Sequence, residues 1–245
     1  MKIKTASSRV SETRRLIVHM IREQWAKEEG RLPSEERIAE MFGVSRSTVR
    51  AALGELESSG FIHRKHGLGT FVNPIASQIH ARLDAWIEFK KLIEQSGFEA
   101  DIQLLGLHKG PLSPDEAKKL GSSPGEPAVT VRKLFTADGQ PAILCQDTIP
   151  LALLPPDCNA ALLETSDTFH FLAKNGLGPV SYGVAHLIAR CADAALADLL
   201  RIPAGTPLLA LENVGYAPSD SPLFLSSELY CPGLIDFGIM RRHLY

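Results

Sequence analysis

The chain has little cysteine and no long apolar stretch. Its four cysteines form no Cys-x-x-Cys pair, so the sequence favours neither a zinc knuckle nor a disulfide framework; they are Cys145, Cys158, Cys191 and Cys231. Thiols in a reducing compartment are the simpler interpretation. The first residues hold no apolar signal segment, and no stretch approaches the roughly 18 to 20 apolar residues that cross a bilayer. We therefore expect a cytoplasmic protein that does not enter a membrane.

Recognisable catalytic groups are also missing. The sequence has no nucleophile, metal cluster or cofactor loop at a spacing that would support chemistry, and its eight histidines are scattered. His63 and His66 fall in a predicted hairpin, where contact with phosphate explains them better than a metal does. We expect no catalytic residue, no cofactor and no metal site. Measured turnover of a substrate would overturn the first of these expectations.

The charge is divided unevenly along the 245 residues, although the net charge is only −2. Residues 1–73 carry 13 lysines and arginines against 9 acidic residues, whereas residues 74–245 carry 13 against 19. With 44% hydrophobic residues, the chain can bury a sizeable core in one domain or two. A basic N-terminal segment followed by an acidic remainder is typical of a nucleic-acid-binding domain joined to a second domain.

The beginning of the chain predicts two helices. An amphipathic helix is expected over residues 10 to about 28, because apolar side chains recur there at intervals of three and four residues. Pro33 then interrupts the pattern, and Ser34 is well placed to cap a short helix over residues 35–42. Gly43 suits the left-handed exit from that helix.

A third helix and a small hairpin follow. The helix is expected to begin at Ser45 and to stop at Gly60. Two helices joined by a short turn that contains glycine make a helix-turn-helix. The segments 61–64 and 70–72 are rich in β-formers and flank a glycine-bearing turn over 65–69, which predicts a hairpin with a cationic tip.

The outward face of the third helix points to DNA binding. Ser45, Arg46, Ser47, Thr48 and Arg50 cluster at its N-terminus, where free backbone amides and the helix dipole favour a phosphate. Arginine can also fork onto the guanine edge, and the hydroxyls suit phosphates or bases. The alternative is that the serine only caps the helix and the arginines only face solvent. The turn spacing and the basic hairpin favour DNA binding.

The segment RLPSEERIAEMFGVSRSTVRAALGELESSGFIHRKHGLGTFV resembles the DNA-binding domain of the GntR family of bacterial regulators. The resemblance makes the third helix the recognition helix and the hairpin the wing. It implies DNA contacts from the five residues at the start of the recognition helix and from His66 and Gly67 in the wing. The positive charge of the hairpin adds Arg64. One position departs from the pattern. Many relatives carry arginine directly after Leu-Pro-Ser-Glu, whereas this chain carries Glu36. A contact from the second helix is therefore not implied, and the preferred operator is left open.

The remaining sequence predicts an α+β domain with a mainly antiparallel sheet. Residues 74–84 are interpreted as a linker and 85–245 as the second domain. A helix is expected over 85–95, and the turn at Asp138-Gly139 marks one of two hairpins. Further helices are expected over 113–121, 151–154, 166–174 and 191–200, and strands over 102–108, 127–135, 141–149, 179–188, 207–216 and 222–230.

This second part resembles the UTRA effector-binding domain, so the whole chain is similar to the HutC branch of the GntR family. The resemblance is carried by four pieces in the family's order: PDEAKKLG at 114–121, VTVR at 129–132, DGQP at 138–141 and ADLLRIPAGTPLL at 197–209. It implies a fold like that of chorismate lyase, flanking helices, a ligand cleft between sheet and helices, and a homodimer formed largely through this domain.

The resemblance also marks positions that hold phosphosugars in relatives. Three positions match, at Phe89, Arg132 and Tyr230, and four differ, at Leu134, Cys145, Asp167 and Phe224. A phosphate dianion needs two cationic or helix-terminal donors, so the loss of a second arginine and the added acid favour a monoanionic or zwitterionic metabolite. We expect Arg132 to hold a carboxylate and Asp167 an amine. The alternative is that Arg132 pairs with a protein carboxylate and Phe224 is core.

The expected function is a DNA-binding repressor of a catabolic or transport operon, released from a palindromic operator by a small metabolite. Two alternatives stay open. An enzyme would show turnover, although fold alone does not carry function. A DNA-binding protein without an effector would use its large domain only to dimerise, and no ligand would then stabilise it.

Overall fold

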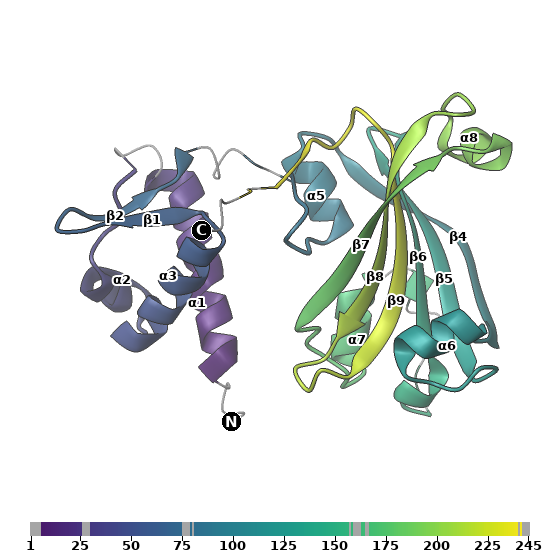
Figure 1. Cartoon of the computed structure of the whole chain (residues 1–245), viewed down its shortest axis with the longest axis horizontal. Coiled ribbons are helices and arrows are strands. Elements are labelled where there is room, and N and C mark those ends of the chain that lie inside the picture. The colour runs from purple at the N-terminus through teal and green to yellow at the C-terminus, as the bar shows by residue number, and fades with distance from the viewer. Residues whose placement is uncertain are drawn as a thin grey trace. The chain divides into compact units, whose positions relative to one another are not determined.

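The chain forms two compact units in the computed structural model, which describes residues 6–25, 30–74, 79, 81–156, 158, 163–164, 167–239 and 241. One unit comprises Met1–His80 together with Phe237–Tyr245, and the other comprises Ala81–Asp236 (Figure 1). The boundary falls inside the predicted linker. Residues from Phe237 on group with the first unit, although we expected the second domain to reach residue 245. Gly238 there lies against Ile79 of the same unit. Among the described helices, none is both long and apolar enough to span a membrane.

Helices and a hairpin build the described part of the first unit. The α-helix α1 (Ala6–Met20) continues as a π-helical turn, η1 (Ile21–Trp25), and is followed by α2 (Glu35–Phe42) and α3 (Arg46–Ser58). The predicted end of the first helix near residue 28 lies outside the described residues. The bounds of α2 agree with the prediction because both ends are capped. Ser34 accepts a hydrogen bond from the Arg37 amide at 3.2 Å, and Gly43 adopts a φ of 63°.

The hairpin consists of β1 (Ile62–Lys65) and β2 (Gly69–Val72), paired antiparallel (Figure 1). One apolar core joins all of these elements; its fully buried members include Ile17, Ile38, Val49, Leu53 and Ile62. The stripes that predicted the helices are the residues that meet in this core. The expected winged helix-turn-helix is therefore confirmed.

A six-stranded antiparallel sheet dominates the second unit, in the order β4-β5-β6-β9-β8-β7. Its strands are β4 (Ala100–Pro111), β5 (Pro127–Ala137), β6 (Gln140–Pro150), β7 (Tyr182–Cys191), β8 (Pro207–Tyr216) and β9 (Pro222–Tyr230). The expected α+β class is confirmed. β8 and β9 have the predicted bounds, whereas β7 starts three residues later than expected, because pairing with β8 fixes its register from Tyr182 to Cys191.

Short helices accompany this sheet. They are α5 (Phe89–Gln95), α6 (Pro114–Leu120), η2 (Leu151–Leu153), α7 (Thr168–Lys174) and α8 (Ala194–Leu200); the short strands β3 (Ala81–Arg82) and β10 (Phe237–Gly238) complete the described elements. α5 starts four residues later than predicted. The segment before it is not helical, and Trp86 there packs on Phe224.

The two faces of the sheet carry different helices. Along β5, Val129 and Val131 face the cluster that contains α7, whereas Leu134 faces the cluster that contains α8. This is the alternation expected of a strand, in which every second side chain points to the same face. The face of Val131 extends to Lys133 and Phe135, which line a pocket.

Candidate nucleic-acid interface and effector pocket

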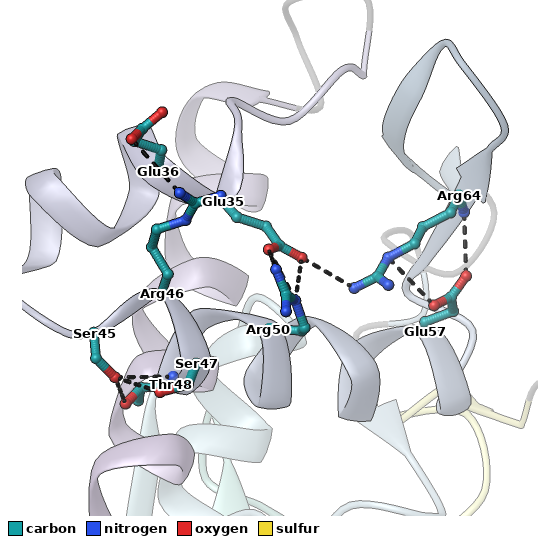
Figure 2. Close-up of polar contacts among 9 residues, drawn as sticks. All are labelled: Glu35, Glu36, Ser45, Arg46, Ser47, Thr48, Arg50, Glu57 and Arg64. Carbon is teal, nitrogen blue, oxygen red and sulfur yellow. Dashed lines mark hydrogen bonds and ion pairs between the residues drawn. The ribbon is translucent and has the colours of Figure 1, made fainter.

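The N-terminus of α3 presents a group of hydroxyls. The Ser45 Oγ accepts a hydrogen bond from the Thr48 amide at 3.2 Å and lies 2.8 Å from the Ser47 Oγ and 2.7 Å from the Thr48 Oγ1 (Figure 2). Ser45 is therefore the helix cap, as both interpretations of the sequence required. Ser45, Arg46 and Ser47 are exposed, whereas Thr48 is half-buried.

A single carboxylate joins the recognition helix to the wing. Glu35, in the first turn of α2, accepts hydrogen bonds from the Arg50 Nε at 3.1 Å and the Arg50 Nη2 at 2.8 Å. The same carboxylate lies 3.6 Å from the Arg64 Nη2, and Arg64 also pairs with Glu57 at 3.5 Å (Figure 2). The hydrogen bond from Arg50 holds the pKa of Glu35 below its usual value. Two predicted DNA contacts are thus brought together by a residue that the sequence analysis did not single out.

The position of Glu35 in the sequence gives only a general signal. This residue directly follows the Ser34 cap in the predicted second helix, and it is acidic in a unit where the exposed face of the next helix is basic. Acids in the first turn of a helix are ordinarily explained by the helix dipole. That general explanation hides the specific contacts with Arg50 and Arg64, which depend on how the helices and the hairpin pack.

The tip of the wing is open to solvent. His66, Gly67 and Leu68 form the turn between β1 and β2, and all three are exposed. Gly67 adopts a φ of 73°, a region that glycine enters without strain. Arg64 lies on β1 close to this turn. Together with the N-terminus of α3, the surface offers the donors that phosphates and base edges accept.

The second unit contains a pocket between the sheet and the segments around α5 and α7. Aromatic side chains form much of its wall, and four charged side chains enter it. The lining residues are Trp86, Phe89, Lys133, Phe135, Asp147, Asp167, Thr168, Phe169, Phe224, Ser226 and Glu228. The Trp86 and Phe224 rings stack with centroids 5.5 Å apart, and Phe89 meets Phe135 at 4.9 Å.

Buried hydrogen bonds hold the carboxylates of β6 and β9. The Glu228 Oε1 accepts from Asn213 at 2.8 Å and from Ser226 at 3.3 Å, and its Oε2 accepts from the Tyr230 hydroxyl at 2.5 Å. Burial nevertheless raises the pKa of Glu228 to about 7. Asp147 accepts hydrogen bonds from the Thr168 hydroxyl and, at 3.3 Å, from the Cys145 thiol.

Asp167 and Lys133 complete the charged group. Asp167 caps α7, where its Oδ1 accepts from the Phe169 amide at 2.8 Å and the His170 amide at 3.3 Å. Burial raises the pKa of Asp167. Burial also lowers the pKa of Lys133, while the nearby Asp147 opposes that change. Each shift has the sign expected when a charged group leaves water.

Known protein families match both units. The model described as "Bacterial regulatory proteins, gntR family" matches residues 10–72, and the UTRA domain model matches residues 95–233. The chain belongs to the gntR family. The expectation of a DNA-binding transcriptional regulator is thereby confirmed for this gntR-family protein.

Individual relatives cover most of this gntR-family chain. The HTH-type transcriptional regulator Rv0792c of Mycobacterium tuberculosis is 30% identical over 79% of the chain and 71% of its own length. The HTH-type transcriptional repressor NagR of Bacillus subtilis is 26% identical over 81% and 80%. The crystal structure of YydK from Bacillus subtilis covers 94% of the chain and 99% of its own, with a TM-score of 0.71 and 19% identity, and supports the fold alone.

The predicted effector residues of this gntR-family regulator are only partly brought together. Phe89, Asp167 and Phe224 line the pocket. Cys145 and Tyr230 do not line it but are buried next to it, where they donate hydrogen bonds to Asp147 and Glu228. Three of the five predicted positions on this side of the sheet therefore lie at the pocket surface.

Arg132 does not fit the place predicted for it. It precedes Lys133 on β5, and neighbouring strand residues point to opposite faces, so Arg132 lies on the face away from the pocket. The cation at the pocket is Lys133, which the sequence analysis passed over. Positions 132 and 133 point to opposite faces of the sheet, and a shift of one residue in the strand register would exchange those faces.

The pocket of this chain also contains more acidic side chains than the family resemblance implied. The family resemblance implied that Cys145 and Phe224 replace sugar-binding carboxylates, which predicted a less polar site. Asp147 lies two residues beyond Cys145 and Glu228 four beyond Phe224, so each shares the face of the residue it follows. Both were missed because only positions aligned with the family's ligand residues were considered.

Proposed function

We propose that this gntR-family regulator is a homodimeric repressor of the HutC branch that leaves a palindromic operator when a small metabolite binds its second unit. The observation that carries the proposal is the exposed cluster at the start of α3, flanked by Arg50 and Arg64. Repression is supported by the name of the relative NagR, a transcriptional repressor. We expect the protein to act in the cytoplasm, where a bacterial operator lies.

In this proposal each α3 enters a major groove with its N-terminus forward. Arg46 meets a base edge, the hydroxyls of Ser45, Ser47 and Thr48 meet phosphates or bases, and the wing contacts the neighbouring backbone through Arg64, His66 and the Gly67 amide. Two-fold symmetry requires half-sites about one helical turn apart. The affinity of the dimer for the operator therefore depends on the separation of the two recognition helices.

The exposed strand β7 is the feature of the structure that favours a dimer. It lies at one end of the sheet, and all ten of its residues are exposed. Leu187 is 58% exposed, and Tyr182, Val184 and Ile188 are each more than 40% exposed. A long apolar edge strand is a template for pairing with another chain. A second copy that pairs β7 with β7 would cover it in an isologous contact.

Sedimentation equilibrium tests this surface. A Leu187→Lys variant should shift the protein from dimer to monomer, because a lysine blocks edge pairing. Leu104→Lys is the matched control, since Leu104 is a 37% exposed leucine on β4, the opposite edge of the sheet. Dimers that persist in the Leu187 variant and dissociate in the control would overturn the assignment.

The effector is proposed to be a zwitterionic or monoanionic metabolite with an apolar part. Lys133 would hold its carboxylate, Asp167 an amine where one is present, and Phe89 with Phe224 its apolar part. Three carboxylates line the pocket against one lysine, an arrangement that disfavours a phosphate dianion. The effector can release DNA only by favouring a dimer arrangement that no longer fits both half-sites.

The experiment that tests this function begins with selection of bound sequences from a random duplex library by the full-length protein. The proposal predicts a palindrome, bound with a steep salt dependence. Amino acids, amines, carboxylates and phosphosugars are then screened by thermal shift, and each ligand that binds is added to the operator complex. An effector at a hundred times its Kd stabilises by about 2.7 kcal/mol. Selection of no sequence, or release only by phosphosugars, would contradict the respective half of the proposal.

A further inference from the structure

A carboxylate lies beside the first arginine of the recognition helix. The Oε1 of Glu36, in the first turn of α2, is 3.7 Å from the Arg46 Nη1. Figure 2 shows Arg46 extending from the start of α3 toward Glu36, while Ser45 and its hydroxyl partners are turned away from this pair. Both side chains are mostly exposed, at 61% for Arg46 and 67% for Glu36. Exposed ion pairs contribute little to stability, so the fold does not account for the contact.

Glu36 differs from its neighbour Glu35 in a way that matters for DNA. Glu35 is 23% exposed, and its carboxylate is already taken by hydrogen bonds from Arg50. Glu36 makes a longer contact and is 67% exposed. In the proposed function, on which this inference rests, the start of α3 beside Glu36 meets DNA. A carboxylate at such a surface repels phosphates, which lowers affinity for DNA of any sequence.

We propose that Glu36 is a specificity-determining residue that acts through Arg46. The carboxylate lies beside one end of the guanidinium, which restricts the directions in which the remaining donors of its rigid fork can point. An arginine held in this way discriminates guanine better than one that turns freely, because its two donors must match O6 and N7 together. The repulsion between Glu36 and phosphates adds a penalty that all sequences share, so it lowers general affinity, while the discrimination comes from the held arginine.

This role has a signature that a structural role lacks. In Glu36→Gln, affinity for random duplex should rise, because a negative charge is lost. At the same time, preference for the correct base pair opposite Arg46 should fall by about fivefold or more, since a well-placed bidentate contact is worth at least that much discrimination. A variant that only destabilised the protein would weaken both kinds of binding together.

The chain provides a matched control on the same helix. Glu40 pairs with Arg37 at 3.3 Å, and the exposed fractions of the two side chains, 63% and 68%, are close to those of Glu36 and Arg46. Glu40→Gln removes the same charge from the same helix without touching the recognition helix. It should raise affinity for random duplex to some degree and leave base preference unchanged.

The test measures binding of the full-length protein to the selected operator, to its three variants at the base pair opposite Arg46, and to random duplex. Glu36→Gln, Glu40→Gln, Arg46→Ala and the double variant of Glu36 and Arg46 are compared by fluorescence anisotropy. The loss of base preference in Glu36→Gln should disappear when Arg46 is already alanine. The proposal is overturned if Glu36→Gln behaves like Glu40→Gln, or if its loss of preference persists without the arginine.

Discussion

The two units hold their functional residues in different ways. In the DNA-binding unit, the candidate contacts of the recognition helix fall within six consecutive positions that start at Ser45. In the second unit, the pocket residues come from three strands, two helix starts and the segment before α5. Local sequence therefore places the candidate DNA contacts of the recognition helix by itself, whereas the pocket depends on which face of each strand a side chain takes.

The largest expected effect tests that dependence on strand face. Lys133→Met should weaken effector binding by about thirtyfold or more, because removal of one partner from a buried charged group costs about 2–5 kcal/mol. Arg132→Met, one residue away on the opposite face, should change it less than about twofold. Calorimetric titration with the ligand found by screening measures both. The reverse result would restore Arg132 as the anchor.

A second test uses the raised pKa of a buried carboxyl group in the pocket. The folded-state pKa of Glu228 is about 7 and its ordinary value is 4.5. Between these values the folded protein keeps a proton that the unfolded chain has released, so the unfolding free energy falls as pH rises from 4.5 to 7 and stays lowered above that. The total is about 3 kcal/mol. Urea unfolding of Glu228→Gln at several pH values should show a flatter profile.

The control for this profile is Glu212→Gln on the neighbouring strand β8. Glu212 is half exposed and pairs with Lys119 at 3.1 Å, so its loss should leave the slope between pH 4.5 and 7 as it is. A slope that is unchanged in Glu228→Gln would remove this carboxyl group from the account.

Arg46 provides the corresponding test in the DNA-binding unit. Arg46→Ala should cost about 1–3 kcal/mol in operator binding and relax the preference at one base pair in each half-site. Arg37→Ala removes an equal charge from the exposed face of α2 and should reduce binding equally for all sequences. Binding to the operator and to its base-pair variants distinguishes the two, and an unaltered operator footprint for Arg46→Ala would refute the assignment.

The smallest expected effect compares one helix cap from each unit. Ser45→Ala and Ser113→Ala each remove a side chain that accepts a hydrogen bond from the third residue of its helix, so each should lower the unfolding free energy by about 1 kcal/mol. Only Ser45→Ala should also weaken operator binding. Calorimetric unfolding with a parallel binding curve checks this, and an equal loss of operator affinity in Ser113→Ala would contradict the division of roles.

The sequence predicted the first unit closely because its signals are local. Ser34 and Gly43 mark the ends of α2, and the turn to Ser45 fixes the next helix. The contacts of Glu35 with Arg50 and Arg64 could not be predicted. Glu35 is separated from them by 15 and 29 positions in the sequence, and such distant residues meet only through packing. In the second unit the strands were recognisable by composition, yet the face of Lys133 against Arg132 is set by the pairing register, which neither residue encodes alone.

The account depends most directly on the start of α3 distinguishing one duplex from another. Binding of the full-length protein to its selected operator and to a random duplex of equal length, measured over a salt series, tests this. We expect the operator to bind about a thousandfold more tightly or better at physiological salt, with a preference that persists as salt rises. Equal affinity for both duplexes at every salt concentration, with and without the pocket's ligand, would contradict it.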